Sequence, residues 1–411
     1  MDKLILSART VLPVSSKPLK NVSLLVAGGK IREIGKTDII RRRNKSVKEL
    51  DLGEGILLPG FVNAHTHLEL GWIKERLGNF DGFTGWLEQI VKTKRDGVSE
   101  NSLTKSVREG IDALIGTGVT TVGEISSYGG VDKPILKNSG LRTVLYREIM
   151  DSNENEVDFY TLESGGLFQE RLFPHAPYSC GPRLIKKALD SHDRNGVPLG
   201  IHLAESTDEV RFVRGEENGI EKKVFPLINK TPFERPVAET PYAYLKKSGL
   251  APGAKITLVH MVHVGEEETG ELRDRDIGIV LCPRSNFLLQ VGEPPLKQYA
   301  GLERVGLGTD GLSSNYNLDF FEEIRFLHLL MSRSLTEEAA RRAVHCATLG
   351  GAGALYMEEE TGSIEAGKEA DLIFLKPKNK SKDPYLSVIS STSQDLRFLM
   401  VRGNILFSDY M

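Results

Sequence analysis

The chain has 411 residues, of which 40% are hydrophobic and 27% charged, and its formal net charge is -3 at pH 7, which suits one barrel-sized domain with a smaller unit. The near-neutral charge gives no basic field that would recruit nucleic acid, and no segment approaches the length of a membrane span. Since the N-terminal apolar run also ends too early for a signal peptide, we expect a cytoplasmic protein that acts on a small molecule.

Both ends of the chain contain short β-type runs separated by tight turns. In residues 1–57, the stretch Ala27 to Lys30 predicts a hairpin turn between two such runs. Residues 358–411 show the same pattern, with β-type runs at 372–375 and 398–406. Because the segment between the two ends differs, we expect one small β-sandwich domain built from residues 1–57 plus 358–411.

The middle of the chain, residues 58–357, shows β-type runs separated by helical patterns, which is typical of a parallel α/β architecture. The helical patterns include residues 102–117, 184–195 and 335–350. The candidate strands are residues 55–64, 119–125, 143–149, 171–175, 198–203, 255–260, 278–282 and 304–309. Eight strands predict a (β/α)8 barrel of the TIM type, in which the chemistry lies at the C-terminal ends of the strands.

The first candidate barrel strand ends in Asn63-Ala64-His65-Thr66-His67. Alternate residues of a strand face the same side, so His65 and His67 can both reach one metal ion. Taken alone the pair is weak evidence, because two nearby histidines arise by chance in a chain of this length. The other strand ends decide whether a metal site is present.

Polar side chains end three later candidate strands. His202 and Glu205 follow residues 197–201, His260 follows 256–259, and Asp310 follows 305–309. Packing alone does not account for this coincidence. The set therefore predicts a metal site where the strand ends converge.

The chemistry that uses such a set is hydrolysis by an activated water. Neutral imidazoles and a carboxylate suit one divalent ion, with Zn2+ favoured and Fe2+ or Mn2+ as alternatives. A bound ion lowers the pKa of water to about 7. Glu205 can carry a proton to the substrate, and Asp310 can ligate the ion while accepting the proton of the attacking water.

These segments carry a family resemblance. Together with Val259 to His263, Cys282 to Asn286 and Leu307 to Gly311, they resemble the amidohydrolase superfamily, specifically its deaminase and chlorohydrolase branch. Residues 361–372 are similar to that family's passage into its C-terminal sheet, so the resemblance covers essentially the whole chain.

The resemblance implies one metal ion held by four residues, with Glu205 as proton shuttle and His260 polarising the substrate or water. The implied metal ligands are His65, His67, His202 and Asp310. Binuclear relatives carry a carboxylated lysine at the end of the fourth strand. This chain has His175 there, which favours a single metal.

Five further residues are candidates for substrate contacts: Glu69, Trp72, Arg147, His175 and Arg284. Glu69 can face the mouth of the barrel and bind sugar hydroxyls, with a solvated loop carboxylate as the alternative. Arg147 and Arg284 end the third and seventh candidate strands, where arginine can bind a substrate carboxylate through paired donors. Ion pairs with neighbouring barrel acids are the alternative for both.

Two segments bear on the substrate. Pro174 to Ser179 resembles the substrate-contacting stretch of S-adenosylhomocysteine and methylthioadenosine deaminases, with a loop-ordering hydrogen bond as the alternative role of His175. His67-Leu68-Glu69, with residues 231–250, resembles the subgroup that deaminates 6-aminodeoxyfutalosine, an adenine nucleoside bearing a benzoate, in menaquinone biosynthesis. The resemblance thus implies a metal-dependent hydrolase that acts on C–N bonds other than peptide bonds. Its expected reaction is the deamination of a 6-aminopurine nucleoside, and 6-aminodeoxyfutalosine is the favoured substrate.

Other functions remain open at this point. S-adenosylhomocysteine, methylthioadenosine, adenosine and chlorinated or aminated triazines are alternative substrates, because the metal set acts on the reacting carbon and not on its substituents. A non-catalytic scaffold is disfavoured, since every expected ligand and Glu205 are present. Barrels of this type often pair, so a homodimer is possible.

Overall fold

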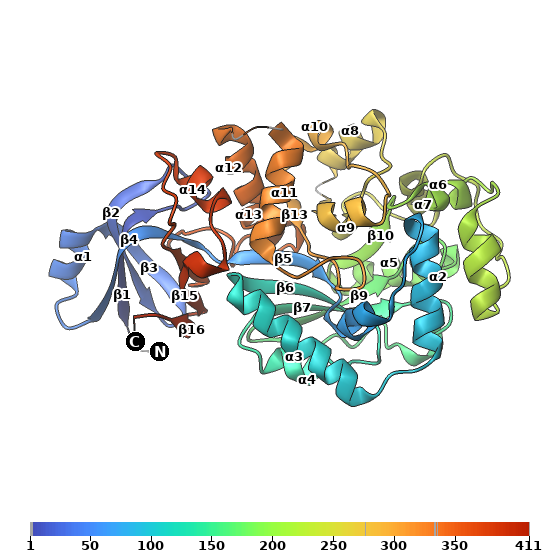
Figure 1. Ribbon diagram of the computed structural model, residues 1–411, viewed down its shortest axis with the longest axis horizontal. Helices are drawn as coiled ribbons and strands as arrows, with labels where there is room; N and C mark the ends of the chain where they lie inside the picture. Colours follow the sequence, from blue (N-terminus) through green and yellow to red (C-terminus); the bar gives the residue numbers. More distant parts are fainter. Residues whose placement is uncertain (1–2, 276, 333, 335, 411) are drawn as a thin grey trace.

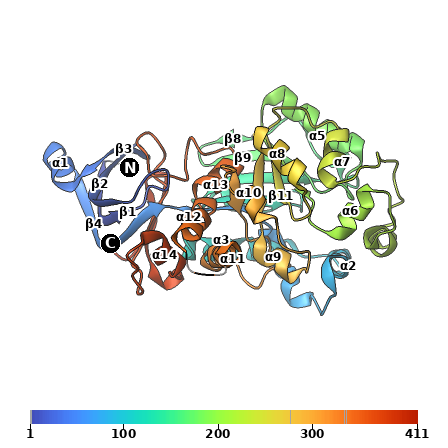
Figure 2. The same cartoon turned by 90° about the horizontal axis from the view of Figure 1, so that it is seen from above.

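The computed structural model describes residues 3–275, 277–332, 334 and 336–410. Strands from both ends of the chain form a small part, and the residues between them form a larger α/β part beside it (Figures 1 and 2). The first and the last described strands, β1 and β16, both belong to the small part (Figures 1 and 2). Of the helices described, none combines the length and hydrophobicity that a membrane crossing requires.

The small part is a seven-stranded sheet with strand order β16-β15-β14-β4-β1-β2-β3. Its strands are β1 (Leu4–Val11), β2 (Leu19–Ala27), β3 (Lys30–Lys36), β4 (Lys48–Pro59), β14 (Leu372–Leu375), β15 (Leu396–Val401) and β16 (Asn404–Ser408). Gly28 and Gly29 form the predicted hairpin turn with φ of 60° and 77°, as a two-residue turn requires. β4 pairs with β1 on one edge and with β14 on the other, so all seven strands belong to one hydrogen-bonded sheet, and the β-sandwich arrangement stays a prediction.

The larger part contains a nine-stranded sheet with strand order β10-β11-β12-β13-β5-β6-β7-β9-β8. Its strands are β5 (Phe61–Thr66), β6 (Val119–Ser126), β7 (Arg142–Ile149), β8 (Ser164–Gly165), β9 (Phe168–Pro174), β10 (Leu199–Leu203), β11 (Ile256–His260), β12 (Gly278–Leu281) and β13 (Val305–Leu307). Every pairing from β10 round to β9 is parallel, and only the short β8 is antiparallel. The eight predicted strands therefore form one parallel sheet.

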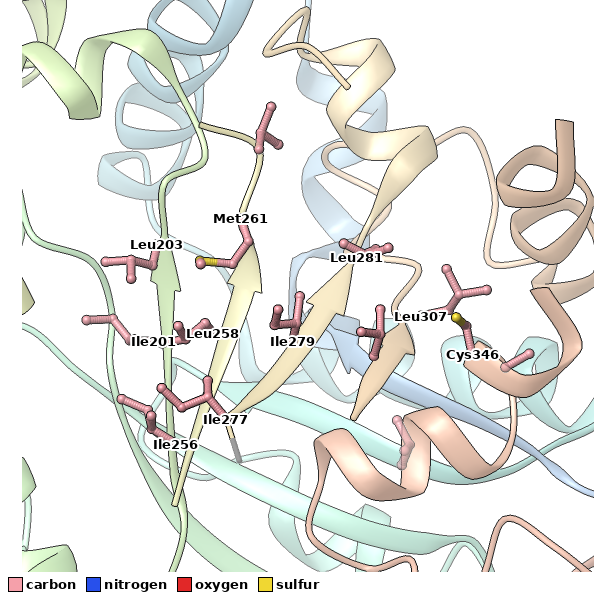
Figure 3. Packing of buried hydrophobic residues seen from close by; sticks show 14 of the residues in the cluster. Ile201, Leu203, Ile256, Leu258, Met261, Ile277, Ile279, Leu281, Leu307 and Cys346 are labelled. Atoms are coloured by element: carbon pink, nitrogen blue, oxygen red, sulfur yellow. The ribbon is translucent and has the colours of Figure 1, made fainter. Parts of the chain in front are cut away.

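The two ends of this parallel sheet lie against each other. The backbone N–H of His202, on β10, donates to the carbonyl of His175 directly after β9, at 3.0 Å. Side chains alternate between two hydrophobic clusters, as strands with two covered faces require. Ile201, Leu258 and Ile279 are neighbours in register and pack with the helices (Figure 3). The opposite face of six strands contributes to a second cluster, which includes Val62, Val144, Phe173, Val259 and Val280.

Helices connect the strands and cover the outside of the sheet (Figure 1). The α-helices are α1 (Thr37–Arg43), α2 (Gly82–Arg95), α3 (Glu100–Gly116), α4 (Lys133–Lys137), α5 (Pro182–Asn195), α6 (Thr207–Val213), α7 (Pro241–Lys247), α8 (Glu266–Asp274), α9 (Pro283–Leu288), α10 (Leu296–Tyr299), α11 (Phe320–Ser332), α12 (Glu337–Cys346), α13 (Leu349–Ala354) and α14 (Pro384–Ile389). Shorter helical segments are η1 (Leu68–Arg76), η2 (Glu154–Glu156), η3 (Ile220–Val224), η4 (Phe225–Ile228) and η5 (Ser393–Asp395). The helix predicted over 335–350 is instead two helices, α12 and α13. The break brings Gly351 so close to the sheet that an added Cβ would lie 2.9 Å from Val62 Cβ.

A buried ion pair joins the two parts of the molecule. Arg142 begins β7, and its Nε donates to Asp371 Oδ2 at 2.7 Å. Asp371 precedes β14 and also accepts hydrogen bonds from Thr361 Oγ1 at 2.9 Å and the backbone N–H of Arg402 at 2.7 Å. Its own carbonyl accepts from the N–H of Gly60, the residue between β4 and β5, at 3.0 Å. Arg142 and Asp371 are each 2% exposed, so both charges depend on these partners.

Candidate metal centre and active site

The histidines of β5 lie at the C-terminal end of the parallel sheet. His65 and His67 each place Nε2 at 3.7 Å from Asp310 Oδ1. The backbone holds β5 and the end of β13 together, because Asp310 N–H donates to the His65 carbonyl at 3.1 Å. This approach requires glycine at position 308, where an added Cβ would lie 2.7 Å from the His65 carbonyl oxygen.

His202 and His260 complete the cluster of imidazoles. Nε2 of His202 lies 3.3 Å from Nε2 of His65. Two groups of side chains, each with ligand atoms within 4.8 Å of one another, share His65: one with His67 and Asp310, the other with His202 and His260. The structure thus brings together the four predicted ligands and His260.

The chemical state of these side chains fits a divalent metal ion. Burial and neighbouring imidazoles lower the pKa of His67 and His202 well below the usual value, which keeps both rings neutral. His202 Nδ1–H donates to the His175 carbonyl at 3.0 Å, which leaves Nε2 free to bind a metal. Burial would raise the pKa of Asp310, but the nearby imidazoles outweigh it and keep the carboxylate ionised.

Glu205 and His260 form a second pair at the edge of this cluster. Glu205 Oε1 lies 3.5 Å from His260 Nε2, and both side chains are buried. Burial, and secondarily the charges of Asp310 and Glu209, raise the pKa of Glu205 well above its usual value. His260 donates from Nδ1 to Asn286 Oδ1 at 3.0 Å, so its Nε2 faces Glu205 unprotonated, and burial lowers its pKa to about 4.

Three of the strand ends bend through left-handed backbone conformations. Ala204, His260 and Asp310 have φ of 55°, 77° and 56°. Non-glycine residues seldom adopt this region, and such conformations concentrate at functional sites. The carboxylate of Glu209 holds one of these bends, because it accepts the N–H groups of Ala204 and Glu205, both at 2.9 Å.

Sequence reasoning assigned no role to several residues that support the site. Glu209 is one, and Asn286 is another. Ser285 is a third, and it donates from Oγ to Asp310 Oδ2 at 2.7 Å. The last two lie in the motif Cys282 to Asn286, so their position after a strand end was the available signal. Glu209 lies in the first turn of α6, four residues after Glu205, and this position was a weaker signal.

A cavity of about 730 Å3 opens above these residues. Its lining includes His175 and five residues of the site: His67, His202, Glu205, His260 and Asp310. Its walls are mainly apolar and come from α2, η3, η4 and the residues after them, with Trp86, Ile90 and Phe225 among them. His175 Nδ1 lies 2.7 Å from Ser179 Oγ, so His175 both faces the cavity, as its predicted substrate contact requires, and orders the loop after β9. The site can therefore accept a mostly apolar molecule with a polar reacting group.

Glu69 does not line the cavity, and both expectations for it are wrong. It is fully buried, and its Oε2 accepts the N–H groups of Ser127 and Tyr128 at 2.7 and 3.1 Å. Burial, with the nearby charge of Asp132, raises its pKa to about 8. Glu69 lies on η1 and is thus held by the backbone that directly follows β6, outside the cavity lining.

Three other predicted substrate contacts also lie outside the cavity lining and need the same correction. Arg284 forms the alternative ion pair, with Nη2 at 2.9 Å from Glu322 Oε2. Arg147 donates to the carbonyl of Thr161 at 2.7 Å. Trp72 packs under the guanidinium of Arg76, whose Cζ lies 4.7 Å from the centroid of the ring. Local partners thus hold all three side chains away from the site.

Comparisons with known proteins agree with this architecture. The 5-methylthioadenosine/S-adenosylhomocysteine deaminase of Moorella thermoacetica is 27% identical over 99% of this chain and 95% of its own. The 5'-deoxyadenosine deaminase of Methanocaldococcus jannaschii is 26% identical, over 95% of this chain and 92% of its own. Each match therefore covers nearly the whole length of the relative as well as of this chain.

Solved structures show the same fold. The aminofutalosine deaminase of Helicobacter pylori, in complex with methylthio-coformycin, has a TM-score of 0.84 at 24% identity and covers 98% of this chain and 100% of its own. An adenosine deaminase from Xanthomonas campestris with bound zinc has a TM-score of 0.81 at 22% identity, with coverage of 100% and 94%. The atrazine chlorohydrolase of Arthrobacter aurescens with zinc has a TM-score of 0.82 at 21% identity, with coverage of 99% and 96%. These likenesses support an α/β fold of the TIM-barrel type.

A family model described as "Amidohydrolase family" matches residues 56–406, which is most of the chain. The match agrees with the resemblance carried by the strand-end motifs. The protein belongs to the amidohydrolase family and is a hydrolytic enzyme.

Proposed function

We propose that the protein is a metal-dependent aminohydrolase that deaminates a 6-aminopurine nucleoside. The observation that carries the proposal is the pairing of Glu205 with His260 beside a buried metal-ligand cluster, all beneath one cavity. The names of the relatives support it, because those reported above by sequence are deaminases of adenine nucleosides.

The residues present fit one divalent ion, which we propose is Zn2+, with Fe2+ or Mn2+ as alternatives. Three imidazole nitrogens and one carboxylate are the donors such an ion prefers. The ligands would be His65, His67, His202 and Asp310. When bound, the ion supplies Lewis acidity, which allows water to act as a nucleophile at neutral pH.

The side chains around the ligands supply the proton transfers. Deamination adds water to the carbon that bears the amino group, and the amino group leaves as ammonia. Glu205 has a raised pKa, so it can hold a proton for the purine ring and then for the departing amine. Asp310 can accept the proton of the attacking water. His260, oriented by Asn286, directs its Nε2 toward Glu205 and the substrate.

We propose 6-aminodeoxyfutalosine as the favoured substrate and menaquinone biosynthesis as its pathway. The resemblance of residues 231–250 supports this choice, since Thr231 and Phe233 from that segment line the cavity. Its apolar walls suit an adenine nucleoside with an aromatic appendage. S-adenosylhomocysteine, methylthioadenosine and adenosine are the alternative substrates, and a triazine is less favoured because the sequence relatives reported above act on nucleosides.

Two features of the organisation belong to the same proposal. We propose that residues 1–57 with 358–411 form one domain and residues 58–357 form the catalytic domain, although β4 continues to Pro59. We propose a homodimer as the state in solution. Light scattering during size-exclusion chromatography would measure its mass.

Metal analysis combined with ammonia release tests the function. The purified enzyme should contain about one divalent ion per chain and release ammonia from at least one adenine nucleoside in a panel that differs only in the 5' substituent. Removal of the ion by a chelator should abolish ammonia release, and Zn2+ should restore it. A protein without bound metal and without activity on every member of the panel would contradict the proposal.

A further inference from the structure

One face of helix α2 forms a wall of the active-site cavity. Its cavity-facing residues recur at helical spacing: Trp86, Leu87, Ile90, Val91 and Lys94. Trp86 donates from Nε1 to the carbonyl of Ser313, three residues after Asp310, at 2.7 Å. Two turns later, Lys94 places its Nζ 5.3 Å from the centroid of the Tyr128 ring, which follows β6. The helix therefore runs along the cavity and brings Lys94 to it near the C-terminal end of α2.

Lys94 differs from the two other cations of the cavity lining. Lys230 Nζ is 2.9 Å from both Asp151 Oδ2 and the carbonyl of Ser179. Arg95 is exposed, and its Nη1 donates to the carbonyl of Leu227 at 2.8 Å. Lys94 is half-buried, and within the described part of the chain its ammonium forms no hydrogen bond or ion pair. A half-buried ammonium without such a partner is available to a ligand.

The acids near Lys94 do not neutralise it by direct contact. Glu148 lines the same cavity, and its Oε1 lies 3.9 Å from Nε2 of His175, an imidazole whose pKa burial lowers to about 3. Burial raises the pKa of Glu148, and Lys94 only partly offsets this effect. Glu69 accepts hydrogen bonds from the backbone N–H groups of Ser127 and Tyr128 and does not line the cavity. An anion that enters the cavity would therefore find Lys94 unpaired.

We propose that Lys94 binds a carboxylate carried by the 5' appendage of the substrate. This inference rests on the proposed function, since it names the class of nucleoside that the same site selects. A carboxylate fits better than a phosphate because a single ammonium faces the ligand, amid apolar side chains such as Trp86 and Ile90. The apolar walls suit an aromatic spacer between the nucleoside and the charge. The enzyme thus selects a 6-aminopurine nucleoside with an aromatic carboxylate.

A pair of substrates that differ only in this charge tests the inference. The probes are 6-aminodeoxyfutalosine and its methyl ester, and the measurement is kcat/KM for ammonia release. The variants are Lys94→Met, which keeps the aliphatic stem, and Lys94→Arg, which keeps the charge. Lys92→Met is the matched control, because Lys92 lies on the same helix but is exposed and paired with Glu88 at 2.6 Å.

The expected result is a preference of the unchanged enzyme for the acid over the ester by about 10- to 100-fold, the range of a hydrogen bond to a charged group. Lys94→Met should bring this ratio close to one, Lys94→Arg should retain much of it, and Lys92→Met should retain all of it. Equal use of acid and ester by the unchanged enzyme would overturn the inference. An equal fall of kcat/KM for the acid and the ester in Lys94→Met would also overturn the inference. Such a result would mean that Lys94 stabilises the buried acids nearby and does not bind the charge of the substrate.

A second measurement separates this inference from the proposed function. The 6-oxo counterparts of the acid and the ester bind without turnover, so calorimetry can compare their Kd values in all four proteins. If neither probe nor any other adenine nucleoside of the panel releases ammonia, the proposed function fails, and calorimetry then decides the role of Lys94. A preference for the acid that is lost in Lys94→Met supports the carboxylate site, whereas equal binding or no binding of either compound overturns it.

Discussion

Glu205 and the proposed metal ligands occupy one cluster, but we expect their roles to be separable. Glu205→Gln should keep the bound metal, because Glu205 is not among the ligands, and should lower kcat by about 10^2- to 10^4-fold through loss of the proton shuttle. Metal analysis and steady-state kinetics on the same preparation would measure both effects. Retained turnover would assign the proton transfer to another group.

Asp310 should affect the metal as well as the rate. Asp310→Asn removes the single carboxylate of the ligand set, so the metal content and kcat should both fall. Ser285→Ala is the matched comparison, because it removes only the hydrogen bond to Asp310 Oδ2 and should cost about 10- to 100-fold in metal affinity. Normal metal content in Asp310→Asn, measured after dialysis against a weak chelator, would show that Asp310 is not a ligand.

The sequence predicts residues at strand ends better than residues whose position depends on tertiary packing. His65, His202 and Asp310 follow apolar runs, and a parallel sheet brings such positions together whatever surrounds them. Glu69 depends on how η1 packs against the end of β6, which the local sequence does not specify. Lys94 has no local signal at all, because its role follows only from the docking of α2 across the cavity.

At the scale of elements, α2 is held at both ends by contacts with other segments. Trp86 anchors one end to Ser313, and Arg95 anchors the other to Leu227. Trp86→Phe keeps the aromatic wall but removes one hydrogen bond, which costs about 0.5–1.5 kcal/mol, so KM should rise by about 2- to 12-fold with kcat little changed.

The second tryptophan provides the control for this prediction. The chain has only two tryptophans, and Trp72 lies outside the cavity lining. Trp72→Phe should leave KM unchanged, and it makes Trp86 the single indole fluorophore, so ligand binding can be followed by its emission. A rise in KM for Trp72→Phe alone would contradict the placement of both residues.

The boundaries of elements depend on close approaches that the sequence only hints at. The run 55–64 predicts one strand, but Gly60 separates β4 from β5. An added Cβ at Gly60 would lie 2.1 Å from Thr120 Oγ1, so the chain passes directly against β6 there. The predicted helix 335–350 breaks at residues 347–348, and Gly350 and Gly351, which follow the break, lie directly against the sheet. Periodicity identifies the elements, whereas contacts between distant segments decide where they end.

At the scale of the whole molecule, Arg142 joins the small sheet to the parallel sheet. Arg142→Leu leaves Asp371 buried without its charged partner, which should destabilise the protein by about 3–5 kcal/mol. Urea unfolding, followed by circular dichroism, would measure the loss. Arg397→Leu is the matched control, since Arg397 pairs with the exposed Asp409 and should cost only about 0–1 kcal/mol. Equal losses in the two variants would contradict the structural role of Arg142.

The position of β4 has a consequence for synthesis on the ribosome. One edge of β4 pairs early with β1, but the other edge waits for β14, which is made near the end of translation. An open strand edge is a template for pairing with other chains, so the nascent protein carries this hazard until residue 375 emerges. Asp371 also holds Gly60, from which β5 starts toward His65. The backbone that leads into the first strand of the site is therefore held in part by a residue that is translated after all of the candidate metal ligands.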